Sequence, residues 1–225
     1  MIEITHHIQK SILKYLTKQK TARYSQMRPP KVDSNLYSYH LKSLLKGGLI
    51  IKNDKDYSLS PSGLNYVETV SLDKFQIHSQ PKITTRILLK NHNNQFLLTR
   101  RSKQPLIGMW GFISGKIQDT DNRISDSAQR EIYEKTNLKL QNLDHIGDYY
   151  VKILSENEVI SNTFSHVFTV QISEQISAKI PISESQNWFS YEEMTNLEVM
   201  PDIFDLIYLS SHSDGKFFAE LEYEI

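Results

Sequence analysis

The sequence contains no cysteine, and this absence excludes several kinds of chemistry. Disulfide bonds, thiolate nucleophiles and cysteine-ligated zinc are all ruled out. A cysteine-free chain also fits a reducing compartment, so we expect a cytoplasmic protein. The first residues, MIEITHHIQKSILKYL, lack the apolar run of a signal peptide. No segment approaches the ~20 apolar residues of a spanning helix, so we expect no membrane association.

Glycine and proline are also scarce, with 8 and 7 residues among 225. This composition excludes fibrous and low-complexity classes, and the length favours two domains. The formal net charge is zero, but residues 1–70 hold 11 Lys and Arg against 5 Asp and Glu, whereas residues 71–225 hold 15 against 21. Such asymmetry is typical of a basic module that binds a polyanion, although chance variation in surface charge gives the same pattern.

Apolar residues recur at every fourth position near the start of the chain. They are Ile4, Ile8, Ile12 and Leu16. This stripe predicts an amphipathic helix that begins at Ile4 and ends at 18–20. A short segment at 24–27 follows, and Pro29-Pro30 stops it because proline cannot continue a helix.

A second long helix is expected after Asp33 or Ser34, either of which can cap it, and before Gly47-Gly48, which supplies a left-handed stop. Its expected core face consists of Leu36, Leu41, Leu44 and Leu45. Two strand-like runs, 49–51 and 57–59, then flank a polar cluster and predict a β-hairpin. A further helix is expected after Pro61.

This order of elements is that of a winged helix-turn-helix, and the segment YSYHLKSLLKGGLIIKNDKDYSLSPSGLNYVE resembles that family. The resemblance covers residues 4–70 and implies binding of double-stranded DNA by a homodimer, with the third helix in the major groove and the hairpin on the backbone. Alternatively, the module mediates dimerisation or other protein contacts. The implied DNA-binding residues are Arg28, Lys31, Asn35, Tyr37, Ser38, Lys42, Lys46, Lys52 and Lys55.

Periodicity is lost after Val70, so we expect a linker over 71–80 between a domain of residues 1–70 and one of residues 81–225. The runs ITTRILLK and QFLLTRR, separated by residues 91–94, predict a hairpin. HVFTVQI predicts another strand, and the last ten residues alternate as in a half-buried strand with an acidic outer face.

The most informative stretch is WGFISGKIQDTDNRISDSAQREIYEKTNL, residues 110–138. It resembles the Nudix box, whose pattern is Gly, five residues, Glu, seven residues, then Arg-Glu-aliphatic-x-Glu-Glu-x-Gly-aliphatic. Gly115, Asp121, Arg130, Glu131 and Glu134 fill positions of this pattern. The resemblance implies an α/β/α sandwich with a mixed sheet, so the whole chain is expected to be an α+β protein.

The residues themselves also predict the helix of this motif. Either residue of Ser125–Asp126 can cap it, and Ala128 and Ile132 form an apolar stripe. Glu131 and Glu134 then project together on a neighbouring face. Two carboxylates on a rigid helix are the kind of ligand that Mg²⁺ requires.

The resemblance also implies roles for individual residues. Gly115, Asp121, Glu131 and Glu134 would hold Mg²⁺ or Mn²⁺, which neutralises a diphosphate and activates water. Arg130, Glu131 and Glu134 would be the catalytic residues of a pyrophosphohydrolase acting on a nucleoside diphosphate linked to another group. The residues expected to bind this phosphate-containing molecule are Arg100, Trp110, Lys135 and Glu184.

Four features depart from the family pattern. Ile113-Ser114 replaces Pro-Gly, one extra residue separates Asp121 from Arg130, and Asn137 stands in place of the late glycine. The fourth departure is Lys135, which replaces a metal-ligating glutamate with a group that repels cations. Either its ammonium replaces the charge of a metal, so that the pocket binds a diphosphate without cleaving it, or the site has decayed and binds nothing.

Two classes of function follow from these motifs. In the first, which the degenerate box favours, a DNA-binding transcriptional regulator senses a nucleotide-diphosphate-type metabolite and needs no metal. In the second, the chain is a Nudix pyrophosphohydrolase that uses the winged helix for recruitment or dimerisation. A scaffold with neither activity is the third possibility.

Overall fold

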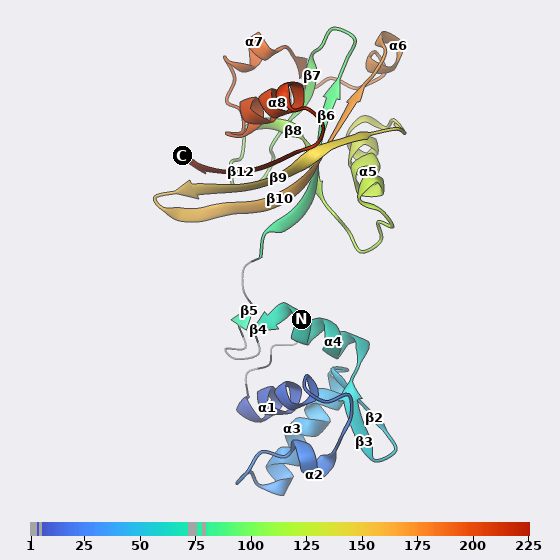
Figure 1. Cartoon of the computed structure of the whole chain (residues 1–225), viewed down its shortest axis with the longest axis vertical. Coiled ribbons are helices and arrows are strands. Elements are labelled where there is room, and N and C mark those ends of the chain that lie inside the picture. The colour runs from blue at the N-terminus through green and yellow to red at the C-terminus, as the bar shows by residue number, and fades with distance from the viewer. Residues whose placement is uncertain (1–3, 5, 72–75, 78–79) are drawn as a thin grey trace. The chain divides into compact units, whose positions relative to one another are not determined.

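The computed structural model describes residues 4, 6–71, 76–77 and 80–225. The chain divides into two compact units, Met1–Ser79 and Gln80–Ile225 (Figure 1). No helix within the described ranges is long and apolar enough to cross a membrane.

The first unit has the element order of a winged helix-turn-helix. Its helices are α1 (His7–Leu16), α2 (Tyr24–Met27), α3 (Ser34–Lys46) and α4 (Pro61–Thr69), and its antiparallel sheet orders β1 (Ala22–Arg23), β3 (Asp56–Leu59) and β2 (Ile50–Asn53). The hairpin of β2 and β3 was predicted from the sequence. Helix α1 begins later than the expected Ile4, because the His6 side chain accepts a hydrogen bond from the Ile8 N–H and caps the helix at that point.

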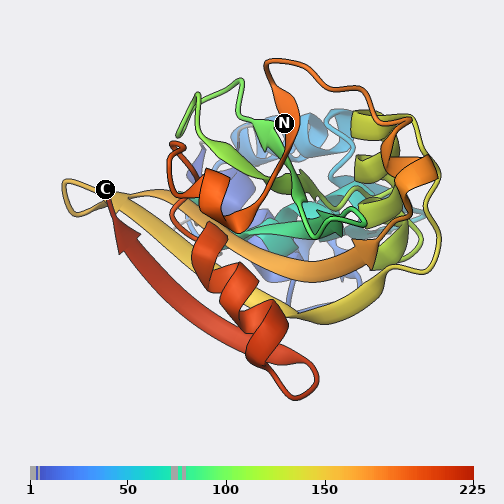
Figure 2. The ribbon, with the colours of Figure 1, turned by 90° about the horizontal axis from the view of Figure 1, so that it is seen from above.

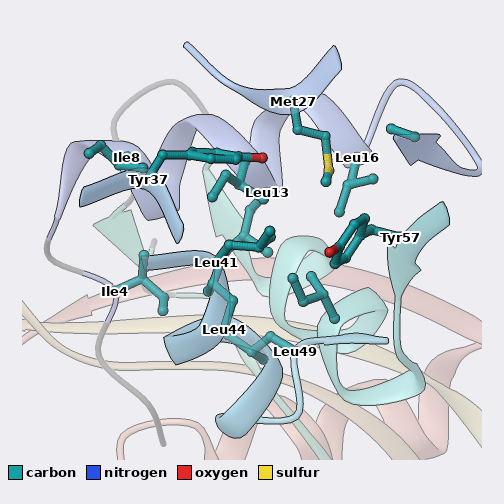
Figure 3. Close-up of a cluster of buried hydrophobic side chains, with 13 residues drawn as sticks. Ile4, Ile8, Leu13, Leu16, Met27, Tyr37, Leu41, Leu44, Leu49 and Tyr57 are labelled. Carbon is teal, nitrogen blue, oxygen red and sulfur yellow. The ribbon is translucent and has the colours of Figure 1, made fainter. Parts of the chain in front are cut away.

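The core of this unit corrects two predictions about α3. Tyr37, expected on the outward face, is fully buried near Ile8 and Leu13 (Figure 3), and its hydroxyl donates to the carbonyl of Tyr24 at 3.2 Å. Leu36, expected in the core, is 45% exposed. The buried face contains residues 37, 40, 41 and 44, which is the spacing of one helical stripe, and Leu36 falls about 100° away from it.

The expected linker contains a short two-stranded ladder, β4 (Val70–Ser71) with β5 (Gln76–Ile77). The remainder of the linker prediction, residues 72–75 and 78–79, lies outside the described residues.

The second unit is a three-layer α/β/α sandwich. Its elements are β6 (Lys82–Lys90), β7 (Phe96–Arg100), β8 (Trp110–Lys116), α5 (Ile124–Thr136), β9 (Asp144–Ser155), β10 (Glu158–Gln171), α6 (Glu174–Ser177), β11 (Gln186–Phe189), α7 (Tyr191–Met194), α8 (Ile203–His212) and β12 (Phe217–Glu224). The sheet order is β11-β7-β8-β6-β10-β9-β12, with β6–β10 and β9–β12 parallel. Helix α5 packs on one face and α8 on the other, where it crosses the β9–β12 edge (Figure 2).

The expected hairpin of β6 and β7 forms only at its turn. These strands pair only at Lys90 and Phe96, and beyond that point β8 lies between them and pairs with both. Strand β8 is suited to this central position because it is buried on both faces. Phe112 contributes to the core on one face of the sheet, and Ile113 contributes to the core on the opposite face. This arrangement places the end of β8 beside α5.

Candidate functional site

Helix α5 carries the acidic motif residues and has well-defined ends. The backbone N–H of Arg123 donates to the Asp126 carboxylate at 3.1 Å, so Arg123 is the N-cap residue and the expected caps, Ser125 and Asp126, lie inside the first turn. Asn137 ends the helix with a left-handed φ of 57°, a conformation that asparagine adopts more readily than most residues other than glycine.

Glu131 points from α5 onto strand β8. A Cβ atom on Gly115 would lie 1.8 Å from the carboxyl carbon of Glu131, so only glycine leaves room for this side chain. Burial raises the pKa of Glu131 above its ordinary value, even though Arg130 donates a hydrogen bond to it. The buried carboxylate of Glu131 therefore packs directly against the motif glycine, Gly115.

Arg130 binds all three acidic residues of the motif. Its Nε and Nη2 donate to the two oxygens of Asp121 at 3.1 and 2.9 Å. Its Nη1 donates to Glu131 at 2.6 Å and to Glu134 at 3.3 Å. Nη2 also donates to the carbonyl of Lys116 at 3.0 Å. One guanidinium thus joins the motif loop, α5 and the end of β8.

A cavity of about 500 Å³ lies beside β8 and is lined by six cationic side chains and, among the described residues, by no acidic one. The cations are Arg86, Arg100, Arg101, Lys103, Lys116 and Lys135. A smaller cavity of about 200 Å³ shares three of them and adds Lys82. Such a lining attracts anions, and Arg and Lys are the side chains that bind phosphate groups.

The family model of the NUDIX domain matches residues 80–208. The chain belongs to the Nudix family. Its structure is similar to that of NrtR from Shewanella oneidensis at 20% identity and a TM-score of 0.49, over 57% of this chain and 60% of that one. The NUDIX domain of Shewanella oneidensis NrtR complexed with ADP ribose gives 19% identity and 0.49, over 66% and 96%. The MutT protein of Bacillus halodurans gives 20% and 0.47, over 64% and 90%. The comparison with curated proteins found no match to this chain.

The residues of the Nudix motif do not fit a divalent metal ion as they are arranged. Asp121 and Glu131 already accept hydrogen bonds from the guanidinium of Arg130. The side chain of Glu134 is 52% exposed, and Lys135 occupies the neighbouring position. Mg²⁺ needs several oxygen ligands, and a cation that competes for them weakens its binding. The three carboxylates that the resemblance implies as metal ligands therefore already accept hydrogen bonds from Arg130.

The other expected ligand-binding residues divide into two groups. Arg100 and Lys135 line the larger cavity. Trp110 packs edge-on against Phe189, with 5.0 Å between ring centres, and neither Trp110 nor the exposed Glu184 is among the described residues that line it. Trp110 therefore contacts Phe189 and does not line this cavity.

The sequence prediction missed four cations of the cavity, Arg86, Arg101, Lys103 and Lys116. Two signals were available. Arg101 and Lys103 follow Arg100 in a cation-rich run directly after a strand, and Arg86 interrupts an otherwise apolar strand. A charge inside a buried strand requires a partner, and here Arg86 donates to Asp202, which is fully buried.

The hydrogen bonds to Asp121 predict how the stability of the fold changes at acid pH. Hydrogen bonds from Arg130 and from the Gln118 N–H lower the pKa of Asp121 from 3.8 to about 2. A carboxylate with a lowered pKa stabilises the fold above its unfolded pKa, and this contribution is lost as the pH falls to the folded pKa. We therefore expect the stability difference between the native protein and Asp121→Asn to shrink as the pH falls from about 5 to about 2.

Urea unfolding across this pH range measures that difference. Asp119→Asn, at an exposed position of the same loop, is the control. A difference that stays constant with pH would show that the Asp121 ion pair contributes nothing to folding.

In the winged-helix unit most of the expected DNA-binding side chains are exposed. They are Arg28, Lys31, Asn35, Lys42, Lys46, Lys52 and Lys55. Ser38 is half-buried, and its hydroxyl lies 2.6 Å from that of Tyr24. A hollow of about 360 Å³ lies between the start of α2 and the β2–β3 hairpin, which is the wing of this unit, and is lined by Arg23, Lys52 and Lys55. The sequence prediction did not include Arg23.

Proposed function

We propose that the chain is a DNA-binding transcriptional regulator whose Nudix domain binds a nucleotide-diphosphate-type metabolite without cleaving it. One observation carries this proposal. The cavity beside β8 is lined by six cations, while Arg130 holds the neighbouring carboxylates. Lys135 supplies positive charge where the motif calls for a metal ligand, so a diphosphate can be neutralised without Mg²⁺ or Mn²⁺.

The winged-helix unit supports the DNA-binding part of the proposal. Asn35, Lys42 and Lys46 are exposed on α3, and Lys52 and Lys55 are exposed on the wing. A helix flanked by a cationic hairpin suits a major groove and the phosphates beside it. A homodimer would place two such helices on two half-sites.

We expect DNA binding to depend strongly on salt and to weaken when the wing loses its cations. Replacing Lys52 and Lys55 by alanine removes two phosphate contacts, so the slope of log affinity against log salt should become smaller by about 2. Fluorescence anisotropy with a duplex selected from genomic fragments measures both quantities.

The matched control for this double variant is Lys18→Ala/Lys20→Ala, which removes the same charge from a different hollow, lined by residues of α4. If both double variants lose the same DNA affinity, the effect comes from the change in net charge and not from contacts made by Lys52 and Lys55. No salt-sensitive binding by the native chain would exclude the DNA-binding role.

The proposal as a whole is tested by the response of DNA binding to ligands. The probes are ADP-ribose, a nucleotide sugar and inorganic pyrophosphate, here called the diphosphate panel. We expect one organic member to shift the midpoint of DNA binding, with no phosphate-containing product released over the same period. The sensing function would be contradicted if the native chain binds DNA, binds no member of the panel, and shows the same DNA affinity with and without each member.

The second candidate is a pyrophosphohydrolase, and one observation favours it. Glu131 and Glu134 lie within reach of the same Arg130 nitrogen, so movement of one side chain would free two carboxylates on one helical face. The winged helix would then serve recruitment or dimerisation. A turnover assay of the unmodified protein on the diphosphate panel, with Mg²⁺ and with Mn²⁺, separates the candidates, because robust hydrolysis would overturn the regulator.

A further inference from the structure

Three metal-ligating side chains meet on the sheet of the Nudix domain, and none of them lines either cationic cavity. His145 and Asp148 belong to β9, and His166 belongs to β10. Asp148 Oδ1 lies 3.0 Å from His145 Nε2 and 2.7 Å from His166 Nδ1. One ligand atom from each residue lies within 4.8 Å of the others, and all three residues are half-buried.

The backbone explains why these three residues share one face. His166 pairs directly with Asp148 across the β9–β10 ladder. Alternation along β9 would turn His145 to the opposite face, but the ladder has an irregularity between Val167 and Phe168, and His145 pairs with Phe168. The extra residue of this bulge reverses the alternation and brings His145 to the side of Asp148.

The surroundings hold both imidazoles in place. The His145 ring lies 5.3 Å from the ring of Phe168, and the His166 ring lies 5.6 Å from the ring of Phe164, measured between centres. Thr85 is the neighbour of His166 in the parallel β6–β10 ladder and therefore points to the same side of the sheet. Its hydroxyl is fully buried and makes no hydrogen bond within the described ranges. A metal-bound imidazole donates its second ring N–H to a nearby acceptor, and a hydroxyl oxygen without a partner is able to accept it.

We propose that His145, Asp148 and His166 bind one divalent first-row transition-metal ion of the zinc class. Imidazole nitrogen and carboxylate oxygen are ligands that such ions accept, and atoms already this close need only small shifts to surround one ion. Each neutral ring turns its bare nitrogen to the ion and keeps its single proton on the other nitrogen. Three protein ligands leave at least one coordination position for water.

Cobalt(II) tests this proposal in the full-length protein, because it takes the place of zinc and reports its ligands by visible absorption. We expect one cobalt ion per chain, a visible band, and loss of that band when zinc is added. His145→Ala and His166→Ala should each weaken cobalt binding by about 10-fold or more, since even outer-shell partners contribute 10–100-fold. Asp148→Asn, which keeps the shape of the side chain, should also weaken it.

Two controls make the result specific. His92→Ala changes an exposed histidine of the same domain, and His6→Ala removes a ring that stacks on His40 at 3.7 Å in the winged-helix unit. Both should retain the band. Absence of a band in the native chain, or a band that survives in His145→Ala and His166→Ala, would overturn the proposal. Circular dichroism without metal confirms that each variant is folded.

Discussion

Replacing Asp202 by alanine should lower the free energy of unfolding of the Nudix domain by about 3–5 kcal/mol, because it leaves the buried Arg86 without a counter-charge. Asp202 is fully buried immediately before α8, and its Oδ2 accepts from Arg86 on β6. Arg86 Nε and Asp202 Oδ1 make no hydrogen bond with any other described residue, so no neighbouring acceptor replaces the lost carboxylate. Urea unfolding followed by tryptophan fluorescence measures the effect in this domain alone, since both tryptophans, Trp110 and Trp188, belong to it.

Two further variants separate the ion pair from simple loss of packing. Arg86→Met/Asp202→Leu replaces both charges by apolar groups and should recover most of the stability, because buried ion pairs are often no more stable than a well-packed apolar pair. Asp214→Ala, at an exposed position, should stay within about 0.5 kcal/mol of the native protein. An Asp202→Ala variant as stable as Asp214→Ala would contradict the role of the pair.

Local features of the fold were predictable from the sequence because they depend on neighbouring residues. Asp33 caps α3 by accepting from the N–H groups of Asn35 and Leu36, and Asn137 takes the left-handed conformation at the end of α5. The pairing of Arg130 with Glu134 also follows from their spacing of four residues. In each case the chemistry lies within one turn or one helical face.

The cationic cavity could not be predicted in this way. Arg86 comes from β6, Lys103 from the segment after β7, and Lys135 from α5. They share one cavity because β8 enters between β6 and β7, and the runs that predicted those two strands contain no information about a third strand between them. The same holds for Asp121, whose bond to Arg130 depends on how the motif loop returns to the helix.

The cavity predicts a large effect on ligand binding. Lys116 lies at the end of β8 and Lys135 near the end of α5, and both line the larger cavity with exposed side chains. Hydrogen bonds to charged groups contribute about 1.5–3 kcal/mol each, so Lys116→Ala/Lys135→Ala should lower the affinity for the bound member of the diphosphate panel by about 100-fold or more. Isothermal titration calorimetry without added metal measures this loss.

Lys179→Ala, an exposed lysine of the same domain that does not line the cavity, is the matched control and should bind as the native protein does. The cationic lining also predicts that Mg²⁺ lowers the affinity rather than raising it, because an ion that shields the diphosphate competes with the lysines. Tighter binding with Mg²⁺, together with unchanged binding in the double variant, would mean that the ligand meets the motif carboxylates through a metal. That result would favour the hydrolase over the sensor. The sensor requires cationic side chains next to the diphosphate, whereas the hydrolase requires carboxylates that hold a metal ion there.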